Sequence, residues 1–390
     1  MKITYIYLND LTEKRANINQ TLNMVSALAD QANVYFFSSW VNQQKITEVI
    51  DFFGAKYNFR LVRLPIILLT NNFFLEQITR ALYSILVLIY LRLFPSDIIY
   101  TRDFGFIYFL SLLPSWLKPK QKIVFEMHVI YHLTSKKVTK DIESKALDCV
   151  NYFIPISKGI QEDLVNIFHI DPQKITVLAD GVNLSYYQQI FGSRNDLLKK
   201  YHSIKPTDKI LIYTGTFLDW KGVDTLILSA KYWSENVKLL LIGGTDPEKT
   251  NMVNLIHQEK VDQKIFVENF LPVKDVIFLL KSADIAIIPN KKVQIGEKYT
   301  SPLKLFEYLA CKLPIVSSDL PSMREVLTEN NAVFFQPDNP QDLAKKINFL
   351  AQNDNICHQL SLANYNLVSQ YDWQVRARKI IQIINNILSL

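Results

Sequence analysis

Residues 299–325 (YTSPLKLFEYLACKLPIVSSDLPSMRE) combine residue types that could bind an anion at the start of a helix. Ser301 is a good helix cap and Pro302 is favoured at the first helical position, so we expect a helix to begin here. The unpaired amides of its first turn and the positive end of its dipole would suit a diphosphate group. Glu307 would lie nearly two turns inside, where its carboxylate could accept hydrogen bonds from a ribose diol. Taken alone, a Ser-Pro pair indicates capping and no more.

A second stretch, residues 211–227 (LIYTGTFLDWKGVDTLI), could supply a positive charge to the same diphosphate. A strand is expected to end at Gly215, and Lys221 with Gly222 is expected to open a helix after a short loop. Gly215 would let the backbone approach the diphosphate closely, and Lys221 would place one ammonium over it. The alternative interpretation of an isolated Lys-Gly pair is an exposed loop.

His128 follows the apolar run IVFEM, so we expect it to point from the end of a strand into the site. His128 and His132 have the i, i+4 spacing of a zinc pair, but HVIYH lacks the glutamate of HExxH. We therefore expect no metal at these two histidines. The alternative to His128 pointing into the site is a purely structural histidine. Arg15 and Arg102 lie in loops that follow predicted strands and could meet an anionic acceptor, or could simply be solvated.

Two series of short apolar runs, separated by helical stretches, provide the frame for these residues. They predict two doubly wound parallel sheets of the α/β class, whose ligands bind at the carboxyl ends of the strands and in a cleft between two Rossmann-like domains. We expect the domains at residues 1–190 and 191–372, with a final helix at 373–390 packing back on the first. The predicted strands are residues 3–8, 34–38, 98–101, 123–127, 152–156, 210–213, 238–242, 265–267, 285–288 and 315–317.

The composition is that of a folded globular protein, with 49% hydrophobic and 21% charged residues in 390. Three widely separated cysteines favour neither a disulfide framework nor a metal knuckle, and the start MKITYIYL indicates a buried strand rather than a signal peptide. Both observations favour the cytoplasm. Residues 1–200 hold 22 Lys and Arg against 17 Asp and Glu. This surplus is modest, and no basic stripe with interleaved aromatic residues accompanies it, which disfavours a nucleic-acid-binding protein.

Residues 81–94 (ALYSILVLIYLRLF) are apolar on almost every side of a predicted helix. The segment is too short to span a bilayer. It is either a helix buried in the core or one that dips into the membrane interface near an acceptor, with Arg80 and Arg92 as anchors in either case. The second alternative would place the protein at the inner face of the membrane.

The order of these motifs resembles the retaining glycosyltransferases of family 4, which have the GT-B fold of two facing Rossmann-like domains. The resemblance rests on GTF followed by KG and, some 80 residues later, on SPLKLFEYLACKLPIVSSDLPSMRE. The segments HVIYH, IPISKGIQEDL, ADGVNLSYY, VKLLLIGG, LPVKDVIFLLKSADIAIIPN and VFFQPDNPQDLAKKI agree with it in order, so it covers almost the whole chain.

The resemblance implies a nucleotide-sugar donor, UDP- or GDP-linked, a glycan, glycolipid or other hydroxyl acceptor, and no metal or other cofactor. It also implies that Glu307 binds the donor ribose, Lys221 the diphosphate, and His128 the donor sugar near the reacting centre. Two positions depart from the family pattern. Tyr299 stands where the first glutamate of E-x7-E is expected, and Thr216 replaces a basic residue, whose charge Lys304 could supply.

The site implied in this way consists of three sets. The catalytic set is His128, Lys221 and Glu307, and the acceptor set is Arg15 and Arg102. The donor-binding set is Gly215, Thr216, Lys221, Tyr299, Ser301, Pro302, Leu303, Lys304 and Glu307. Two alternatives to the enzyme remain open: a non-catalytic partner subunit with this fold, and a sugar-nucleotide epimerase, which has no supporting motif here.

Overall fold

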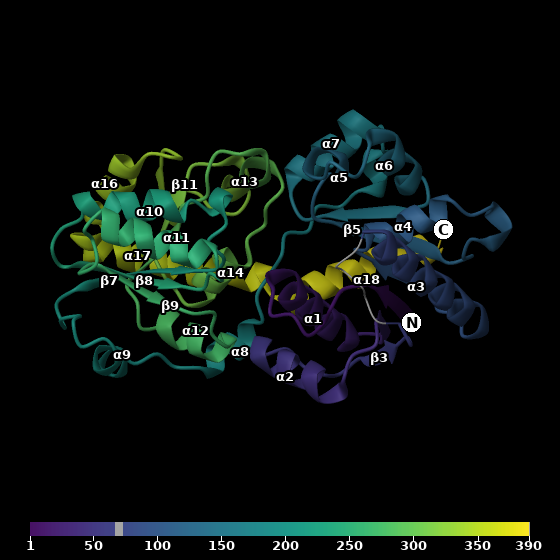
Figure 1. Cartoon of the computed structure of the whole chain (residues 1–390), viewed down its shortest axis with the longest axis horizontal. Helices are drawn as coiled ribbons and strands as arrows, with labels where there is room; N and C mark the ends of the chain where they lie inside the picture. Colours follow the sequence, from purple (N-terminus) through teal and green to yellow (C-terminus); the bar gives the residue numbers. More distant parts are fainter. Residues whose placement is uncertain (67–72, 390) are drawn as a thin grey trace. The chain divides into compact units, whose positions relative to one another are not determined.

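The computed structural model describes residues 1–66 and 73–389 of the chain (Figure 1). The chain divides into two units, one made of Met1–Ala179 with Trp373–Leu390 and the other of Asp180–Asp372. The division therefore falls after residue 179 rather than after residue 190, and residues from 373 onward belong to the N-terminal unit.

The N-terminal unit contains a six-stranded parallel sheet in the order β3-β2-β1-β4-β5-β6. Buried apolar side chains make up most of its inner strands, as expected when helices cover both faces of a parallel sheet (Figure 1). The strands are β1 (Lys2–Ile6), β2 (Asn33–Ser38), β3 (Arg60–Arg63), β4 (Ile98–Thr101), β5 (Lys122–Met127) and β6 (Tyr152–Pro155). The helices are α1 (Ala16–Ala29), α2 (Gln43–Phe53), α3 (Phe73–Leu93), α4 (Phe104–Ser111), η1 (Ser115–Leu117), α5 (Tyr131–Thr134), α6 (Lys140–Leu147), α7 (Lys158–Phe168), η2 (Pro172–Lys174) and α18 (Trp373–Ser389).

The C-terminal unit repeats this topology in a second six-stranded parallel sheet, ordered β12-β11-β10-β7-β8-β9. The strands are β7 (Lys209–Thr214), β8 (Val237–Ile242), β9 (Ile265–Glu268), β10 (Ile285–Ile288), β11 (Ile315–Ser318) and β12 (Ala332–Phe335). The helices are α8 (Leu184–Gln189), α9 (Arg194–Lys200), η3 (Asp219–Lys221), α10 (Val223–Ser229), η4 (Ala230–Tyr232), α11 (Glu248–Gln258), α12 (Val273–Leu280), α13 (Gln294–Lys298), α14 (Leu303–Ala310), α15 (Pro321–Arg324), α16 (Pro340–Ala351), α17 (Asp354–Val368) and η5 (Ser369–Tyr371).

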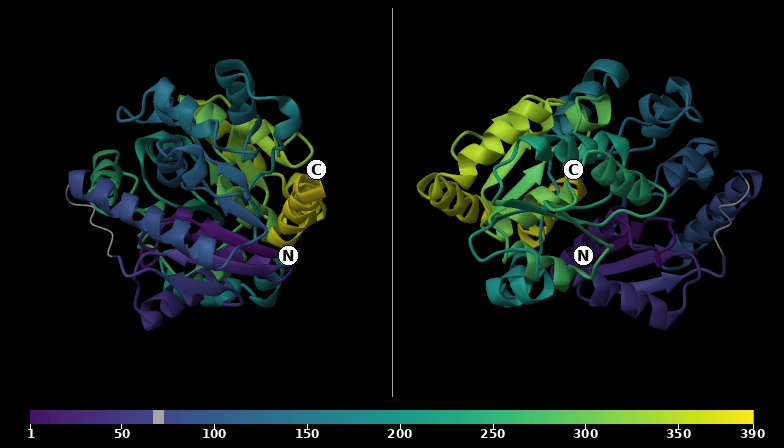
Figure 2. Two further views of the ribbon diagram at one scale, coloured as in Figure 1. Left: turned by 90° about the vertical axis from the view of Figure 1, so that its right-hand side faces the viewer. Right: turned by 60° about the vertical axis from the view of Figure 1, so that its left-hand side comes forward.

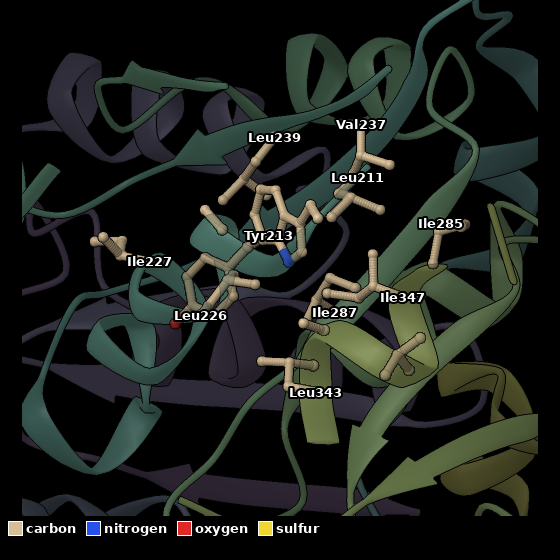
Figure 3. Packing of buried hydrophobic residues seen from close by; sticks show 14 of the residues in the cluster. Leu211, Tyr213, Leu226, Ile227, Val237, Leu239, Ile285, Ile287, Leu343 and Ile347 are labelled. Atoms are coloured by element: carbon tan, nitrogen blue, oxygen red, sulfur yellow. The ribbon is translucent and has the colours of Figure 1, made fainter. Parts of the chain in front are cut away.

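Within each unit the strand order is that of a Rossmann fold, in which the first and fourth strands are neighbours. The expected fold class, two doubly wound α/β sheets, is therefore confirmed. The core of the C-terminal unit lies between its central strands and the helices α10 and α16, where Leu226 and Ile347 are fully buried (Figure 3). This core holds the strand ends and the following loops in fixed positions, which is what a binding site at those ends requires.

Candidate functional site

The carboxyl ends of β7 and β10 mark the point in the C-terminal unit where the strand order reverses. In open α/β sheets, ligands bind outside the strand ends at such a switch point. The loop after β7 is joined to the loop after β10 by a hydrogen bond from the Lys291 amide to the Trp220 carbonyl, 3.0 Å long. Lys291 Nζ also contacts Asp219 and Asp224, each at 2.7 Å. These bonds fix the β7 loop against the switch point.

Two glycines allow this close packing. Gly222 has φ +68°, and a Cβ atom added to it would lie 1.9 Å from the Pro289 carbonyl oxygen after β10. Gly215, at the end of β7, has φ +130°, and a Cβ atom there would lie 2.9 Å from Lys304 Nζ. Any side chain at Gly215 would therefore occupy the space that the ammonium group uses.

Lys304 is the most unusual charged side chain of the site. It is the second residue of α14, only 7% of its surface is exposed, and its Nζ lies 3.5 Å from the centre of the Tyr213 ring. Nζ has no hydrogen-bond partner in the described chain. Burial, together with the nearby charge of Lys221, holds the pKa of Lys304 well below its usual 10.5, although Glu307 acts in the opposite sense. A buried ammonium without a partner destabilises a fold, which indicates that it serves binding.

Lys221 carries the second cation, at the end of η3. Its Nζ lies 3.6 Å from the centre of the Trp220 ring, and burial lowers its pKa to about 7. The charge of Lys221 reaches Lys304 strongly enough to lower the pKa of the latter. The loop after β7 and the first turn of α14 therefore bring two cations together, as an anion site requires.

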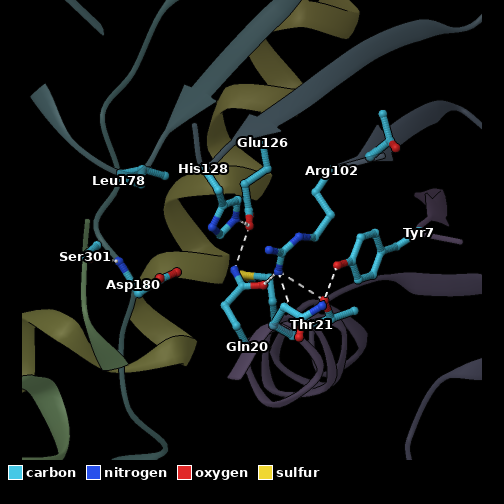
Figure 4. A network of polar contacts seen from close by, with 12 residues as sticks. Tyr7, Gln20, Thr21, Arg102, Glu126, His128, Leu178, Asp180 and Ser301 are labelled. Carbon is cyan, nitrogen blue, oxygen red and sulfur yellow. Dashed lines mark hydrogen bonds and ion pairs between the residues drawn. The ribbon is translucent and has the colours of Figure 1, made fainter. Parts of the chain in front are cut away.

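The start of α14 differs from the expectation in one respect. The N-cap residue is Pro302, without a side-chain cap, and Leu303 is the first helical residue. The Ser301 hydroxyl instead accepts a hydrogen bond of 2.9 Å from the Asp180 amide (Figure 4). The prediction that Ser301 caps this helix with Pro302 at its first position is therefore wrong, because a backbone amide from a distant segment takes the hydroxyl. The Leu305 amide bonds to the Pro302 carbonyl at 2.9 Å, whereas the first two amides of a helix have no carbonyl within the helix to bond to.

Glu307 lies one turn after Lys304 on α14 and is partly buried. Burial raises the pKa of Glu307, while the Tyr187 hydroxyl and the Lys304 ammonium partly offset that effect. Tyr187 belongs to α8, which packs on α14. A carboxylate placed here can accept hydrogen bonds from hydroxyl groups of a ligand whose anionic part lies at the start of the helix.

The two positions that depart from the family pattern have different surroundings. Tyr299 is 2% exposed at the end of α13, and its hydroxyl accepts a hydrogen bond of 3.2 Å from Gln294 Nε2. Thr216 is exposed, and its carbonyl accepts a hydrogen bond of 2.8 Å from the Tyr213 hydroxyl. Tyr213 thus fixes the loop after β7 through its hydroxyl, and the Lys304 ammonium packs against its ring.

Asn290 is a further candidate that the sequence analysis missed. It follows β10 at the switch point, is fully buried, and neither its amide nitrogen nor its amide oxygen has a partner in the described part of the chain. A buried amide with two unpaired groups is rare and indicates an incomplete environment. Its place after an apolar strand in IIPNKK is the only sequence signal that could have identified it.

In the N-terminal unit, His128 follows β5 and its Nε2 lies 2.7 Å from Glu126 Oε1. Glu126 is fully buried and also accepts hydrogen bonds from Gln20 at 2.6 Å, from Tyr100 and, at 2.8 Å, from Arg376 of α18 (Figure 4). Burial alone would raise the pKa of Glu126, but Arg376 and His128 hold it well below 4.5. His128 thus lies at the end of a strand, as expected. It also belongs to a network of charged residues around the buried Glu126.

The other polar residues predicted from the sequence have separate partners. His132 Nδ1 lies 2.7 Å from Glu143 Oε2, so the two histidines contact different carboxylates. Across residues 1–66 and 73–389, no group of three metal-binding side chains is arranged to hold a metal ion. Arg102 is buried and its guanidinium donates to Gln20 and Thr21 of α1 (Figure 4). Arg15 is exposed and pairs with Glu13 at 3.1 Å.

Two family profiles, both of glycosyltransferases, match this chain, one in each unit. The profile described as Glycosyl transferases group 1 matches residues 195–367, and the profile described as Glycosyltransferase Family 4 matches residues 19–186. An uncharacterized glycosyltransferase of Methanocaldococcus jannaschii is 23% identical over 260 residues, which are 62% of this chain and 63% of that protein. The O-antigen chain mannosyltransferase RfbU of Salmonella typhimurium is 20% identical over 222 residues, 57% of this chain and 56% of that protein.

The fold is shared more widely than the sequence. The crystal structure of HepE from Anabaena in complex with UDP has a TM-score of 0.75 and 15% identity over 100% of both chains. The matched segments of the two curated relatives cover 63% and 56% of their lengths. Because the two profiles cover most of both units, and the two Rossmann-like sheets match those of GT-B enzymes, the chain belongs to the group 1 glycosyltransferases.

Proposed function

We propose that this chain is a retaining glycosyltransferase that moves a sugar from a UDP- or GDP-linked donor to a hydroxyl of a glycan or a lipid-linked glycan. The observation that carries the proposal is the buried Lys304 ammonium beside Gly215 at the switch point of the C-terminal sheet, where the charge of Lys221 also acts on it. One lysine in the first turn of α14 and one at the end of η3 match the charge of a nucleoside diphosphate. HepE from Anabaena, whose crystal structure is a complex with UDP, has the same fold.

The residues divide the chemistry as follows. Lys221, Lys304 and the first amides of α14 would stabilise the negative charge that grows on the departing diphosphate, which is the main contribution to catalysis in such a site. Glu307 would bind the ribose, and His128 the donor sugar. The proposal needs no metal or other cofactor, because the two ammonium groups carry the compensating charge.

Nucleotide binding provides the first test. UDP or GDP at about 100 times its Kd should stabilise the C-terminal unit by about 2.7 kcal/mol, which raises the melting temperature of a unit of this size by roughly 5 to 10 °C. Glu307→Gln should reduce the shift, whereas Lys345→Met, an exposed lysine on α16, should leave it unchanged. ADP serves as the comparison nucleotide. The absence of a shift with any of the three would contradict the donor site.

Retention of configuration is a separate part of the proposal. The acceptor hydroxyl would attack on the face that the nucleotide leaves, and the departing phosphate would help to take the proton. Proton NMR of the newly formed glycosidic bond should therefore show the anomeric configuration of the donor sugar. A product with the opposite configuration would contradict retention without affecting the assignment of the donor site. Nucleotide binding without turnover on any acceptor would indicate the non-catalytic partner subunit.

The acceptor and the place of action follow from chemistry and from the named relatives. RfbU is named for O-antigen chains, and a capsular polysaccharide glycosyltransferase of Staphylococcus aureus is 23% identical over 220 residues. We propose a surface polysaccharide or its lipid-linked precursor as the acceptor, with the protein in the cytoplasm at the inner face of the membrane. Across the described residues, no helix is both long enough and apolar enough to cross a membrane.

A further inference from the structure

Helix α3 exposes a continuous row of aliphatic side chains, which we call the α3 stripe: Leu75, Ile78, Leu82, Ile85, Ile89 and Leu93. Their spacing of three and four residues places all six on one face of the helix. Each is between 40% and 68% exposed, and residues 81–91 contain no charged side chain. The outer face of a surface helix normally carries polar and charged residues, so this row marks an interaction surface.

The opposite face of α3 fixes the direction in which the stripe points. Val87 is fully buried, the Tyr83 hydroxyl donates a hydrogen bond of 2.8 Å to the Phe37 carbonyl of β2, and the Tyr90 ring lies 4.9 Å from the Phe37 ring. Figure 2 shows one long side of α3 facing outward from the N-terminal unit. The segment is therefore neither fully buried nor loosely attached, but a helix with an apolar inner face and an apolar outer face.

A cationic turn is attached to the C-terminal end of this helix. Arg92 Nη2 donates a hydrogen bond of 3.2 Å to the Leu117 carbonyl of η1. Trp116, in the same turn, is 76% exposed, and Lys120 and Lys122 follow it on the surface. An exposed tryptophan beside lysines is the combination found where proteins meet the headgroup region of a bilayer. Arg80, in contrast, contacts Glu76 at 3.1 Å, which neutralises it.

We propose that the α3 stripe and the η1 turn, with Arg92, Lys120 and Lys122, dock on the surface of an anionic phospholipid bilayer. The apolar row would enter the boundary between headgroups and acyl chains, and the cations would contact the anionic headgroups. This arrangement explains the exposed apolar residues and the cations together.

The alternative occupant, a second copy of this chain, fits the surface less well. A stable interface between proteins takes about 20 to 30 residues from each side, whereas the α3 stripe supplies six. A bilayer accepts a single helix of this kind, because lipids surround the whole apolar face. The cations of the turn can contact an anionic bilayer without a detailed match of shape. A rigid protein partner would need anionic groups at matching positions.

Docking would bring the enzyme to an acceptor held in the bilayer. Only the identity of that acceptor, a lipid-linked glycan, rests on the proposed function. The surface itself follows from the exposed residues and can be tested without any donor or acceptor. The nucleotide-induced thermal shift belongs to the C-terminal unit and should be the same in every variant of the surface. A failure of docking and a failure of the donor site are therefore distinguishable.

The test is flotation of the full chain with vesicles of phosphatidylcholine containing about 30% phosphatidylglycerol, compared with phosphatidylcholine alone. The wild type should bind the anionic vesicles, and less so at high salt, because salt screens surface charges. Leu82→Gln with Ile89→Gln should weaken binding at least tenfold, since each exposed residue loses its transfer into the apolar region. Lys120→Gln and Lys122→Gln should each weaken it about fivefold.

A matched control is Leu362→Gln, which changes a leucine of α17 that is 51% exposed and lies in the other unit, and which should bind like the wild type. Circular dichroism of each variant checks that the exposed substitutions leave the fold intact. The proposal is overturned if the wild type fails to bind anionic vesicles, or if the Leu82→Gln, Ile89→Gln variant binds them equally well. A concentration-dependent dimer that this variant abolishes would assign the surface to a second copy instead.

Discussion

Replacing Lys304 with methionine should remove most of the affinity for a nucleoside diphosphate while leaving the fold at least as stable. Hydrogen bonds to charged groups contribute about 1.5 to 3 kcal/mol, so binding should weaken roughly tenfold to a hundredfold. Sugar transfer should fall about 10² to 10³-fold, because the charge that develops on the diphosphate loses a preorganised cation. Calorimetric titration with UDP and GDP measures the first effect, and initial rates measure the second.

The stability of the same variant separates a ligand contact from a structural role. Lys304 Nζ is buried without a hydrogen-bond partner in the described chain, so its removal relieves a penalty of about 1 to 3 kcal/mol rather than creating one. The melting temperature without nucleotide should therefore stay the same or rise. Lys345→Met, on an exposed face of α16, is the matched control for the loss of one positive charge. If Lys304→Met binds the nucleotide as tightly as the wild type, the assignment of this lysine is wrong.

The pH dependence of binding provides an independent readout of the same cations. Burial lowers the pKa of Lys221 to about 7, and only the protonated lysine attracts the diphosphate. Affinity should therefore decline as the pH rises through 7 and above, by at most about tenfold per pH unit for Lys221. The terminal phosphate of the nucleotide titrates near pH 6, so measurements above pH 7 isolate the lysines. Lys221→Met should flatten this decline.

The second large effect concerns the buried pair of Glu126 and Arg376, which lie 2.8 Å apart and are 0% and 4% exposed. Arg376→Met should destabilise the N-terminal unit by about 3 to 5 kcal/mol, because it leaves the Glu126 carboxylate buried without its compensating charge. Urea unfolding followed by circular dichroism measures the loss. Arg378→Met, an exposed arginine on the same helix, is the control and should have little effect.

A double variant distinguishes an uncompensated charge from a loss of packing. Adding Glu126→Gln to Arg376→Met removes the remaining charge and keeps one acceptor oxygen where Glu126 has two, one for Gln20 and one for Tyr100, so it should recover part of the lost stability. If the double variant is less stable than Arg376→Met alone, the pair does not act through charge. In the wild type the pKa of Glu126 is held well below 4.5, so its contribution is present above that pH and is lost as the pH falls through the folded-state pKa.

The central strands were predictable because they are continuous apolar runs, and all ten predicted strands are present. The two that were missed, β3 and β12, are edge strands. β3 has the sequence RLVR and is only partly buried, so it lacks the signal of a strand covered on both faces. The apolar character of α3 was evident, but which of its faces is buried depends on contacts with β2 that the sequence does not reveal.

The candidate site shows the same division between local and distant information. Gly215, Lys221, Lys304 and Glu307 lie in two short motifs whose spacing reflects local structure, and their arrangement follows from the Rossmann topology. The Ser301 hydroxyl was assigned wrongly because its partner, the Asp180 amide, is 121 residues away. Arg376 is 250 residues from Glu126, and no pattern near either residue predicts that they meet.

The position of α18 has a consequence for how the protein is made. Its residues Arg376, Ile380 and Ile384 are buried, and Arg376 neutralises Glu126 at the end of β5, yet α18 follows the whole of the C-terminal unit along the chain. As the ribosome delivers the chain from its N-terminus, the C-terminal unit emerges complete before the N-terminal one does. The first sheet to be synthesised is therefore the last to acquire its full core, and until then its buried carboxylate lacks the Arg376 guanidinium.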